Sequence, residues 1–352
     1  MRTAQTTERA TVEIVEQPVP RAVGDLVVVE VLVAPMCTEF KKRRDGIADH
    51  ALGHEAVGVV VDAGDSVRVR AGDRVAVMPH YGCGRCELCT SGDYMHCLEP
   101  RDVLAETGQE SGTATYSQYL LKPDWLLLPI PDDISLTHAT MACCGFGPTF
   151  GALERMQVDA LDVLLVSGCG PVGLGAIVQG VVRGARVIAI ETHPYRADLA
   201  RRLGAELVID PSVDDVAARV HEHTARGADA AIETSGAPGA ANALARSVRR
   251  RGRMSVVAWG AEVTLPPLVP LGLDVFGVWH WNSLRSAEEM WRTIRRARDL
   301  IDLMVTHLLP LDEVAQAMDI QDTGSCGKVL LFPHGLDAAL DPPAGAARVL
   351  AE

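Results

Sequence analysis

Long apolar runs are missing from this chain of 352 residues. A membrane-spanning helix needs about 20 consecutive apolar residues, and the opening stretch MRTAQTTERATVEIVEQ lacks the apolar centre of a secretory signal. An excess of positive charge is missing too, because the formal net charge is -13 and the dense basic runs, 41–44 and 249–251, are short. We therefore expect no membrane partner, no nucleic-acid partner and a cytoplasmic location.

Lysine is rare in this sequence. Among the 33 basic residues (Lys plus Arg), the lysines are Lys41, Lys42, Lys122 and Lys328. The excess of arginine is typical of GC-rich bacterial genes and says nothing about chemistry. Hydrophobic residues at 48% and charged residues at 22% are ordinary for a globular protein. The length suits two domains, each with a core of its own.

Four of the nine cysteines are closely and regularly spaced. Two residues separate Cys83 from Cys86 and Cys86 from Cys89, and Cys97 follows after seven more. In a reducing compartment such clusters more often bind metal than form disulfides. Four thiolates at about 2.3 Å fill the tetrahedral sphere of zinc, so the spacing predicts a closed, structural zinc site. An iron–sulfur cluster is the alternative.

The pattern of apolar residues changes along the chain. The first half shows short β-branched runs between turn signals, at Asp25–Val33, Ala56–Asp62 and Arg74–Met78. After about Leu153, strands and helices alternate, which indicates a parallel, doubly wound sheet. The expected strands there are Val163–Ser167, Val187–Ile190, Leu207–Ile209, Ala228–Ile232 and Met254–Ala258. The first expected helix runs from the glycine-rich turn to about Arg183, and the others are Tyr195–Leu203, Val213–Thr224, Ala240–Arg250 and Ser286–Leu300. A closing strand is expected at Lys328–Phe332, followed by a peripheral tail from Leu336.

A glycine-rich turn follows the first of these strands. In its sequence GCGPVG, Gly168 allows a tight turn, Gly170 allows a pyrophosphate to approach the backbone, and Gly173 allows helix and strand to pack closely. Pro171 and Val172 complete the loop at the start of the helix, whose free N–H groups favour phosphate. The strand–turn–helix context makes this a dinucleotide site.

The second strand of the alternating region ends at an acidic residue, Glu191. A carboxylate there accepts hydrogen bonds from ribose hydroxyls and repels a 2′-phosphate, which favours NAD over NADP. Arg196, one turn further on, could weaken this preference. The alternative for Glu191 is a solvated strand end.

The cysteine segment lies just after the sequence GDRV at Gly72–Val75, and it resembles the structural zinc lobe of zinc-containing medium-chain dehydrogenases. The resemblance extends from about Asp25 to Phe332. It implies a GroES-like, β-rich catalytic domain at 1–152 and 286–352, and a Rossmann NAD-binding domain at 153–285. It also implies a homodimer or homotetramer, and a turn beside the adenine ribose at Ser235.

The same resemblance implies a catalytic zinc with three protein ligands, which leaves a position open for an alcohol oxygen. His54 lies in the family's GHE motif, with Glu55 as a carboxylate near the metal. Cys144 matches the later ligand in the segment CGFGPTFGA, and the adjacent Cys143 is its rival.

The early ligand departs from the family's pattern of Cys, any residue, Ser or Thr, then Asp. The segment here reads Met-Cys-Thr-Glu-Phe at 36–40. Neither Pro35 nor the thioether of Met36 is a good zinc ligand, so Cys37 is the predicted ligand. A two-ligand site and the absence of a catalytic zinc are the alternatives. A shifted loop would place Thr38 beside Cys37, where its hydroxyl could contact the substrate, while Glu39 could relay protons or cap a helix.

Two further segments are candidates for substrate contact. Val278–Asn282 contains two tryptophans, a histidine and an asparagine, which could recognise a hydroxyl-bearing ring or pack in a dimer. His80 and Tyr81, just before the cysteine lobe, could face the same cleft.

The function expected from these features is a zinc-dependent, NAD(P)-linked alcohol dehydrogenase (EC 1.1.1.-). Its substrate would be a secondary alcohol, such as a cyclitol, a sugar-like alcohol or a secondary metabolite, or the matching ketone. The first alternative is a medium-chain reductase of carbonyls or activated double bonds without a catalytic zinc. The second is a non-enzymatic protein that binds nucleotide without turnover.

Overall fold

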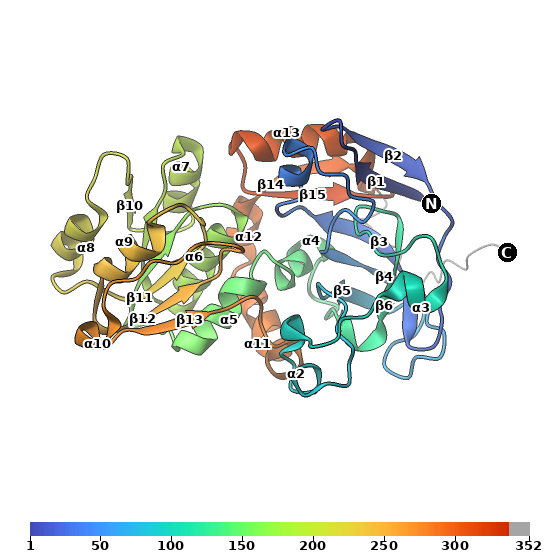
Figure 1. Ribbon diagram of the computed structural model, residues 1–352, viewed down its shortest axis with the longest axis horizontal. Coiled ribbons are helices and arrows are strands. Elements are labelled where there is room, and N and C mark those ends of the chain that lie inside the picture. The colour runs from blue at the N-terminus through green and yellow to red at the C-terminus, as the bar shows by residue number, and fades with distance from the viewer. Residues whose placement is uncertain (338–352) are drawn as a thin grey trace.

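The computed structural model describes residues 1–337, so nearly all of the predicted tail lies outside the described residues. Figure 1 shows two halves side by side, one built on a parallel sheet with helices around it and the other rich in antiparallel strands. Among residues 1–337, no helix combines the length and the apolar character needed to cross a bilayer.

The parallel sheet has six strands in the order β10-β9-β8-β11-β12-β13. Their bounds are β8 Val163–Ser167, β9 Arg186–Ile190, β10 Leu207–Ile209, β11 Ala228–Glu233, β12 Val248–Val256 and β13 Asp274–Gly277. β8 and β11 are buried along their whole length, as expected of central strands covered on both faces by helices. This sheet confirms the predicted Rossmann half of the fold.

The second large sheet has seven strands and is mainly antiparallel. Its strands are β3 Leu26–Pro35, β4 Ala56–Asp62, β5 Arg74–Val77, β6 Tyr119–Pro123, β7 Leu127–Pro129, β14 Val305–Pro310 and β15 Lys328–Phe332. β1 (Arg2–Thr6) and β2 (Val12–Glu16) form a separate pair. β15 pairs with β3, so the last described strand returns to the sheet that the first half of the chain builds (Figure 1). The GroES-like half is thereby confirmed, while the domain limits stay a prediction.

Helices connect and cover these strands. They are α1 Phe40–Arg44, α2 Glu87–Thr90, α3 Val103–Thr107, α4 Leu136–Ala139, α5 Gly147–Met156, α6 Pro171–Arg183, α7 Pro194–Arg202, α8 Val216–Thr224, α9 Ala240–Ser247, α10 Leu268–Leu271, α11 Ser283–Arg296, α12 Arg298–Met304 and α13 Val314–Thr323, with short 3-10 turns at Tyr94–His96, Asp124–Leu126, Thr140–Ala142 and Leu311–Glu313.

Two helix predictions are wrong at their ends. The helix expected at Ala240–Arg250 stops at Ser247, because Val248 already pairs with Ala228 as the start of β12. The single helix expected over Ser286–Leu300 is two helices, which are separated at Ala297. In both places long-range packing decides where the helix ends.

Candidate active site and metal centres

The four spaced cysteines converge on one point in the lobe that carries α2. Their sulfur atoms all lie within 4.8 Å of one another, and none of these cysteines forms a disulfide. The Sγ atoms of Cys83 and Cys89 are 3.9 Å apart, and those of Cys86 and Cys97 are 4.0 Å apart. A tetrahedron with metal–sulfur bonds of about 2.3 Å has edges of about 3.8 Å. The arrangement therefore fits the predicted zinc site.

Backbone N–H groups add to this fit. The N–H of Cys83 donates to the sulfur of Cys97, at 3.2 Å, and the N–H of Cys86 donates to the sulfur of Cys83, at 3.3 Å. Hydrogen bonds from the backbone at Leu98 and Cys89 lower the pKa of Cys86 to about 6. Thiolates are the form that binds metal, so the lobe is prepared for a cation.

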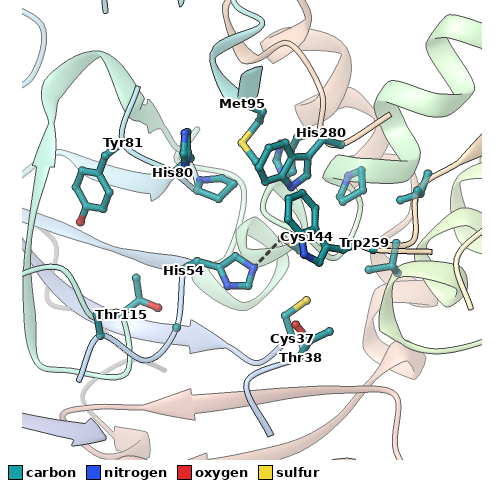
Figure 2. Close-up of a pocket in the computed structure, with 18 of the residues that line it drawn as sticks. Cys37, Thr38, His54, His80, Tyr81, Met95, Thr115, Cys144, Trp259 and His280 are labelled. Atoms are coloured by element: carbon teal, nitrogen blue, oxygen red, sulfur yellow. Dashed lines mark hydrogen bonds between the residues drawn. The ribbon is translucent and has the colours of Figure 1, made fainter. Parts of the chain in front are cut away.

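A second group of metal-binding side chains lies at the end of β3 and the start of β4. The ligand atoms of Cys37, His54, Glu55 and Cys144 all lie within 4.8 Å of one another. His54 Nε2 is 3.3 Å from the sulfur of Cys144 (Figure 2). A hydrogen bond with Cys144 lowers the pKa of Cys37 well below the usual thiol value, against the effect of burial and with help from His54. The three ligands predicted for a catalytic zinc thus meet at one place.

Cys143, the rival of Cys144, points elsewhere. Its sulfur lies 3.7 Å from the carbonyl oxygen of Ala56 and 3.5 Å from that of Val77. Burial raises the pKa of the Cys143 thiol, which suits a neutral core residue rather than a ligand.

Glu39 has a role that the sequence did not reveal. Its carboxylate pairs with Nδ1 of His54 at 2.6 Å and accepts hydrogen bonds from the Tyr116 hydroxyl at 2.8 Å and the Cys37 N–H at 3.0 Å. Burial opposes the charged form, but the charge of His54 and hydrogen bonds that include those from His54 and Tyr116 hold the pKa of Glu39 at about 2. Glu39 occupies the N-cap position of α1, but its side chain makes no capping hydrogen bond there and orients His54 instead.

Glu55 lies behind the metal ligands and forms a fully buried pair with Lys328. The ammonium is 3.0 Å and 3.1 Å from the two carboxylate oxygens, and both side chains are 0% exposed. The carboxylate also accepts the backbone N–H of Cys144. Burial raises the pKa of Glu55 to about 7, an effect that Lys328 opposes. A lysine at the start of the apolar run KVLLF was the available signal for this partner.

The glycine turn has the geometry that its sequence predicts. Gly168 has a φ of +84°, and a Cβ on Gly173 would lie 1.8 Å from the carbonyl oxygen of Gly168. Gly170 is different, because a Cβ there would meet nothing within 4 Å. The space beside Gly170 is open at the start of α6, where phosphate would be expected to bind.

All the predicted cofactor residues line one cavity of about 540 Å³. They are Gly168, Gly170, Pro171, Val172, Gly173, Glu191, Arg196 and Ser235. Glu191 is held by the N–H groups of Cys169, Thr192 and His193, at 2.7–2.8 Å. Ser235 is held by the buried carboxylate of Glu233, which the sequence reading missed.

A larger cavity of about 1020 Å³ adjoins the first. Cys37, Thr38, His54 and Cys144 line it, and Thr38 and Val172 belong to both cavities. Thr38 is exposed and lies beside Cys37, as the shifted-loop prediction supposed (Figure 2). A ligand that reaches from the glycine turn into the larger cavity would end beside the metal-binding side chains.

The residues of the segment Val278–Asn282 have two different roles. Trp279 and His280 line the larger cavity, as do His80 and Tyr81. Trp281 is instead 2% exposed and donates its ring N–H to the carbonyl of Ala142. Asn282 caps α11 and donates to the carbonyl of Ser91 at 2.7 Å. The substrate-contact prediction is therefore wrong for Trp281 and Asn282, which anchor the segment to the β-rich half.

Comparison with known proteins identifies the family. The model described as "Alcohol dehydrogenase GroES-like domain" matches residues 24–132, and the one described as "Zinc-binding dehydrogenase" matches residues 171–296. The sorbitol dehydrogenase of Bacillus subtilis (strain 168) is 30% identical over 338 residues, which cover 90% of this chain and 93% of that protein. The chain belongs to the zinc-containing medium-chain alcohol dehydrogenases.

Other members of the family give the same result. An L-threonine 3-dehydrogenase of Caldanaerobacter subterraneus is 30% identical over 347 residues, 91% of this chain and 95% of that protein. The solved structure of alcohol dehydrogenase TADH from Thermus sp. ATN1 matches with a TM-score of 0.83 and 25% identity, over 94% of this chain and 99% of that chain. This medium-chain dehydrogenase is an oxidoreductase of small molecules, and the non-enzymatic alternative is not supported.

Proposed function

We propose that this medium-chain dehydrogenase interconverts a secondary alcohol and its ketone, with a catalytic zinc and NAD. The observation that carries the proposal is the meeting of Cys37, His54 and Cys144 where the two cavities join. The donor set, two sulfurs and one imidazole, suits zinc and leaves a coordination position open for an oxygen. Cyclitols, sugar-like alcohols and secondary metabolites are the substrate classes we propose.

The roles of the chain's own residues follow from their places. When bound, zinc supplies Lewis acidity that lowers the proton affinity of an alcohol oxygen, and NAD supplies a hydride acceptor. Thr38, at the boundary of both cavities, is placed to hold the alcohol proton and pass it outward. Glu39 fixes the ring of His54, and the turn at Gly168–Gly173 holds the cofactor phosphates. The Glu191 carboxylate favours NAD over NADP.

The names of two relatives support a substrate that carries polar groups in addition to the alcohol that is oxidised. One is a sorbitol dehydrogenase and the other an L-threonine 3-dehydrogenase. We also propose a homodimer or homotetramer, as the resemblance implies, and a cytoplasmic location, which suits nine free cysteines.

Metal counting combined with turnover tests the proposal. We expect two zinc ions per chain in the wild-type protein and one in Cys144→Ser, with NAD reduction by secondary alcohols lost in the variant. A Cys143→Ser variant is the matched control and should keep both ions, because its sulfur faces the carbonyls of Ala56 and Val77. One zinc in the wild type, with no change in Cys144→Ser, would support the reductase alternative instead.

A further inference from the structure

Lys122, on β6, reaches the larger cavity without a counter-ion. The residue is 2% exposed and lines the cavity. Its ammonium donates to the backbone carbonyl of His80 at 2.5 Å and lies 3.9 Å from the centroid of the Tyr81 ring. Within residues 1–337, no carboxylate pairs with it. A buried cation that lacks an anionic partner costs several kcal/mol, so the site is incomplete as it stands.

Other cations of the cavity wall already have partners or face solvent. Arg101 pairs with Asp25 at 2.7 Å and with Glu106 at 2.8 Å. Lys42 pairs with Asp49, and Lys41 is exposed. Lys122 is therefore the buried lysine of this wall whose charge a ligand could neutralise. Burial lowers the pKa of Lys122 to about 7, in keeping with its unpaired state.

Thr115 is a second polar group that lines the same cavity. It is 3% exposed, and its hydroxyl has no hydrogen-bond partner among the described residues. A Cβ on Gly53 would lie 2.3 Å from this hydroxyl, so Thr115 sits directly beside the residue that precedes His54. Figure 2 shows its oxygen directed toward the side of the cavity where His54 lies. An unsatisfied buried hydroxyl also indicates a missing ligand.

We propose that Lys122 and Thr115 recognise a carboxylate on the substrate, so that this dehydrogenase acts on hydroxy acids rather than on neutral alcohols. The inference rests on the proposed function and narrows its substrate. A carboxylate presents two oxygens, which match one ammonium and one hydroxyl. A phosphate would leave more of its oxygens without donors on this wall. An acid derived from a sugar or cyclitol has both the carboxylate that Lys122 and Thr115 would bind and the several hydroxyl groups of the proposed substrate classes.

Pairs of probes that differ only in charge test this inference. Straight-chain 3-hydroxy acids of four to six carbons and 4-hydroxy acids of five or six carbons, all secondary alcohols, are compared with their primary amides, by kcat/KM with NAD and by calorimetric titration of the NAD complex. We expect the wild type to favour the acids by at least tenfold. Lys122→Met should remove this preference through a higher KM for the acids, with the amides changed less than about twofold. Thr115→Val should reduce the preference by a smaller factor.

Two variants control for charge and for folding. Lys122→Arg should retain part of the preference, and Arg9→Met, at an exposed residue that lines neither cavity, should keep it within about threefold, since an exposed charge contributes little. Unchanged NAD affinity and a melting temperature no lower than that of the wild type would show that Lys122→Met is folded. If Lys122 only holds the His80 carbonyl, where φ is +68°, the variant will impair acids and amides equally, and the inference is wrong.

The outcomes also separate this inference from the proposed function. Oxidation of neutral secondary alcohols, with acids and amides treated alike, would overturn the carboxylate site and leave the function standing. Lys122-dependent binding of the acids without any turnover would overturn the function and leave the carboxylate site standing.

Discussion

At the scale of single residues, the buried pair of Glu55 and Lys328 connects the last described strand to the metal-binding side chains. Glu55 follows His54 in sequence, and Lys328 begins β15, which pairs with β3. The carboxylate also accepts the N–H of Cys144, so one residue touches both sides of the cluster. A substitution of Lys328 should therefore lower the stability of the folded protein more than it lowers the catalytic rate.

We expect Lys328→Met to lower the free energy of unfolding by about 3–5 kcal/mol, because it leaves the Glu55 carboxylate buried without its partner. Chemical denaturation of the zinc-loaded protein measures the effect. The double variant Glu55→Gln with Lys328→Met removes both charges and should recover at least half of the loss. Equal losses in the single and double variants would show that the lysine chain, rather than its charge, provides the stability.

Lys122 gives a prediction about pH. Its pKa is lowered by burial to about 7, whereas an unfolded lysine titrates near 10.4. Between these values the unfolded chain binds more protons than the folded one, so wild-type stability rises with pH by at most about 1.4 kcal/mol per pH unit. Lys122→Met lacks this dependence. The variant should exceed the wild type in free energy of unfolding by the largest amount near pH 7, and this difference should shrink toward pH 10. Denaturation midpoints at several pH values measure it. A difference that does not change with pH would contradict the prediction.

Some of these residues could be found from the sequence and others could not. The cysteine spacing, the GHE motif and the glycine turn are local patterns, and their side chains lie together as predicted. Glu39 needed the structure, because its role depends on Tyr116, which is 77 positions away, and on the path of a loop that departs from the family pattern. Lys122 and Lys328 stand out as lysines in apolar strands, but only the strand pairing shows what they face.

At the scale of elements, the turn between β8 and α6 contains two glycines, Gly173 and Gly170, that are needed for different physical reasons. A side chain at Gly173 would collide with the Gly168 carbonyl, whereas a side chain at Gly170 would enter open space. The first glycine thus serves the packing of helix on strand, and the second serves the ligand. The two can be separated by experiment.

We expect Gly170→Ala to leave the melting temperature nearly unchanged and to weaken NAD binding at least tenfold, because its φ of -68° suits alanine but its methyl group fills the phosphate space. Gly173→Ala should lower the melting temperature and weaken NAD binding together. Calorimetry and thermal melts of both variants provide the measurement. Normal NAD affinity in Gly170→Ala would mean that the phosphates bind elsewhere.

Element types were more predictable than element ends. The alternating strands and helices were recognisable from buried β-branched runs and amphipathic stretches, since each strand of a parallel sheet reads as an apolar run. The arginine-rich segment 249–251 read as a helix end, yet it belongs to β12, where it forms an irregularity between Val248 and Arg253, the residues that pair with β11 on either side of it. Pairing between distant segments is not visible in a local window.

At the scale of the whole molecule, the site exists only where the two halves meet. The parallel sheet supplies the cofactor cavity and the β-rich half supplies the metal-binding side chains. Asn282 and Trp281 fix the connection between them, through Ser91 and Ala142. A ligand that fills the joined cavities should therefore stabilise both halves.

We expect NAD at 100 times its Kd to add about 2.7 kcal/mol to the stability of the folded protein. NADP at the same concentration should add less, because the Glu191 carboxylate repels a 2′-phosphate. Thermal melts with each nucleotide measure the difference. Glu191→Gln removes the charge and should reduce the difference between the stabilisation by NAD and that by NADP. Equal stabilisation of the wild type by both nucleotides would contradict the role assigned to Glu191.

The scarcity of lysine acquires a practical meaning from the structure. Lys41, Lys42 and Lys122 line the larger cavity, and the remaining lysine, Lys328, pairs with Glu55 behind the metal-binding side chains. Mild reductive methylation with ¹³C-formaldehyde would attach labels to reactive lysine side chains and to the α-amino group of Met1. A magnetic resonance spectrum of the labelled protein would then hold a few resonances, and those of the lysines that line the cavity would report ligand binding at the active site.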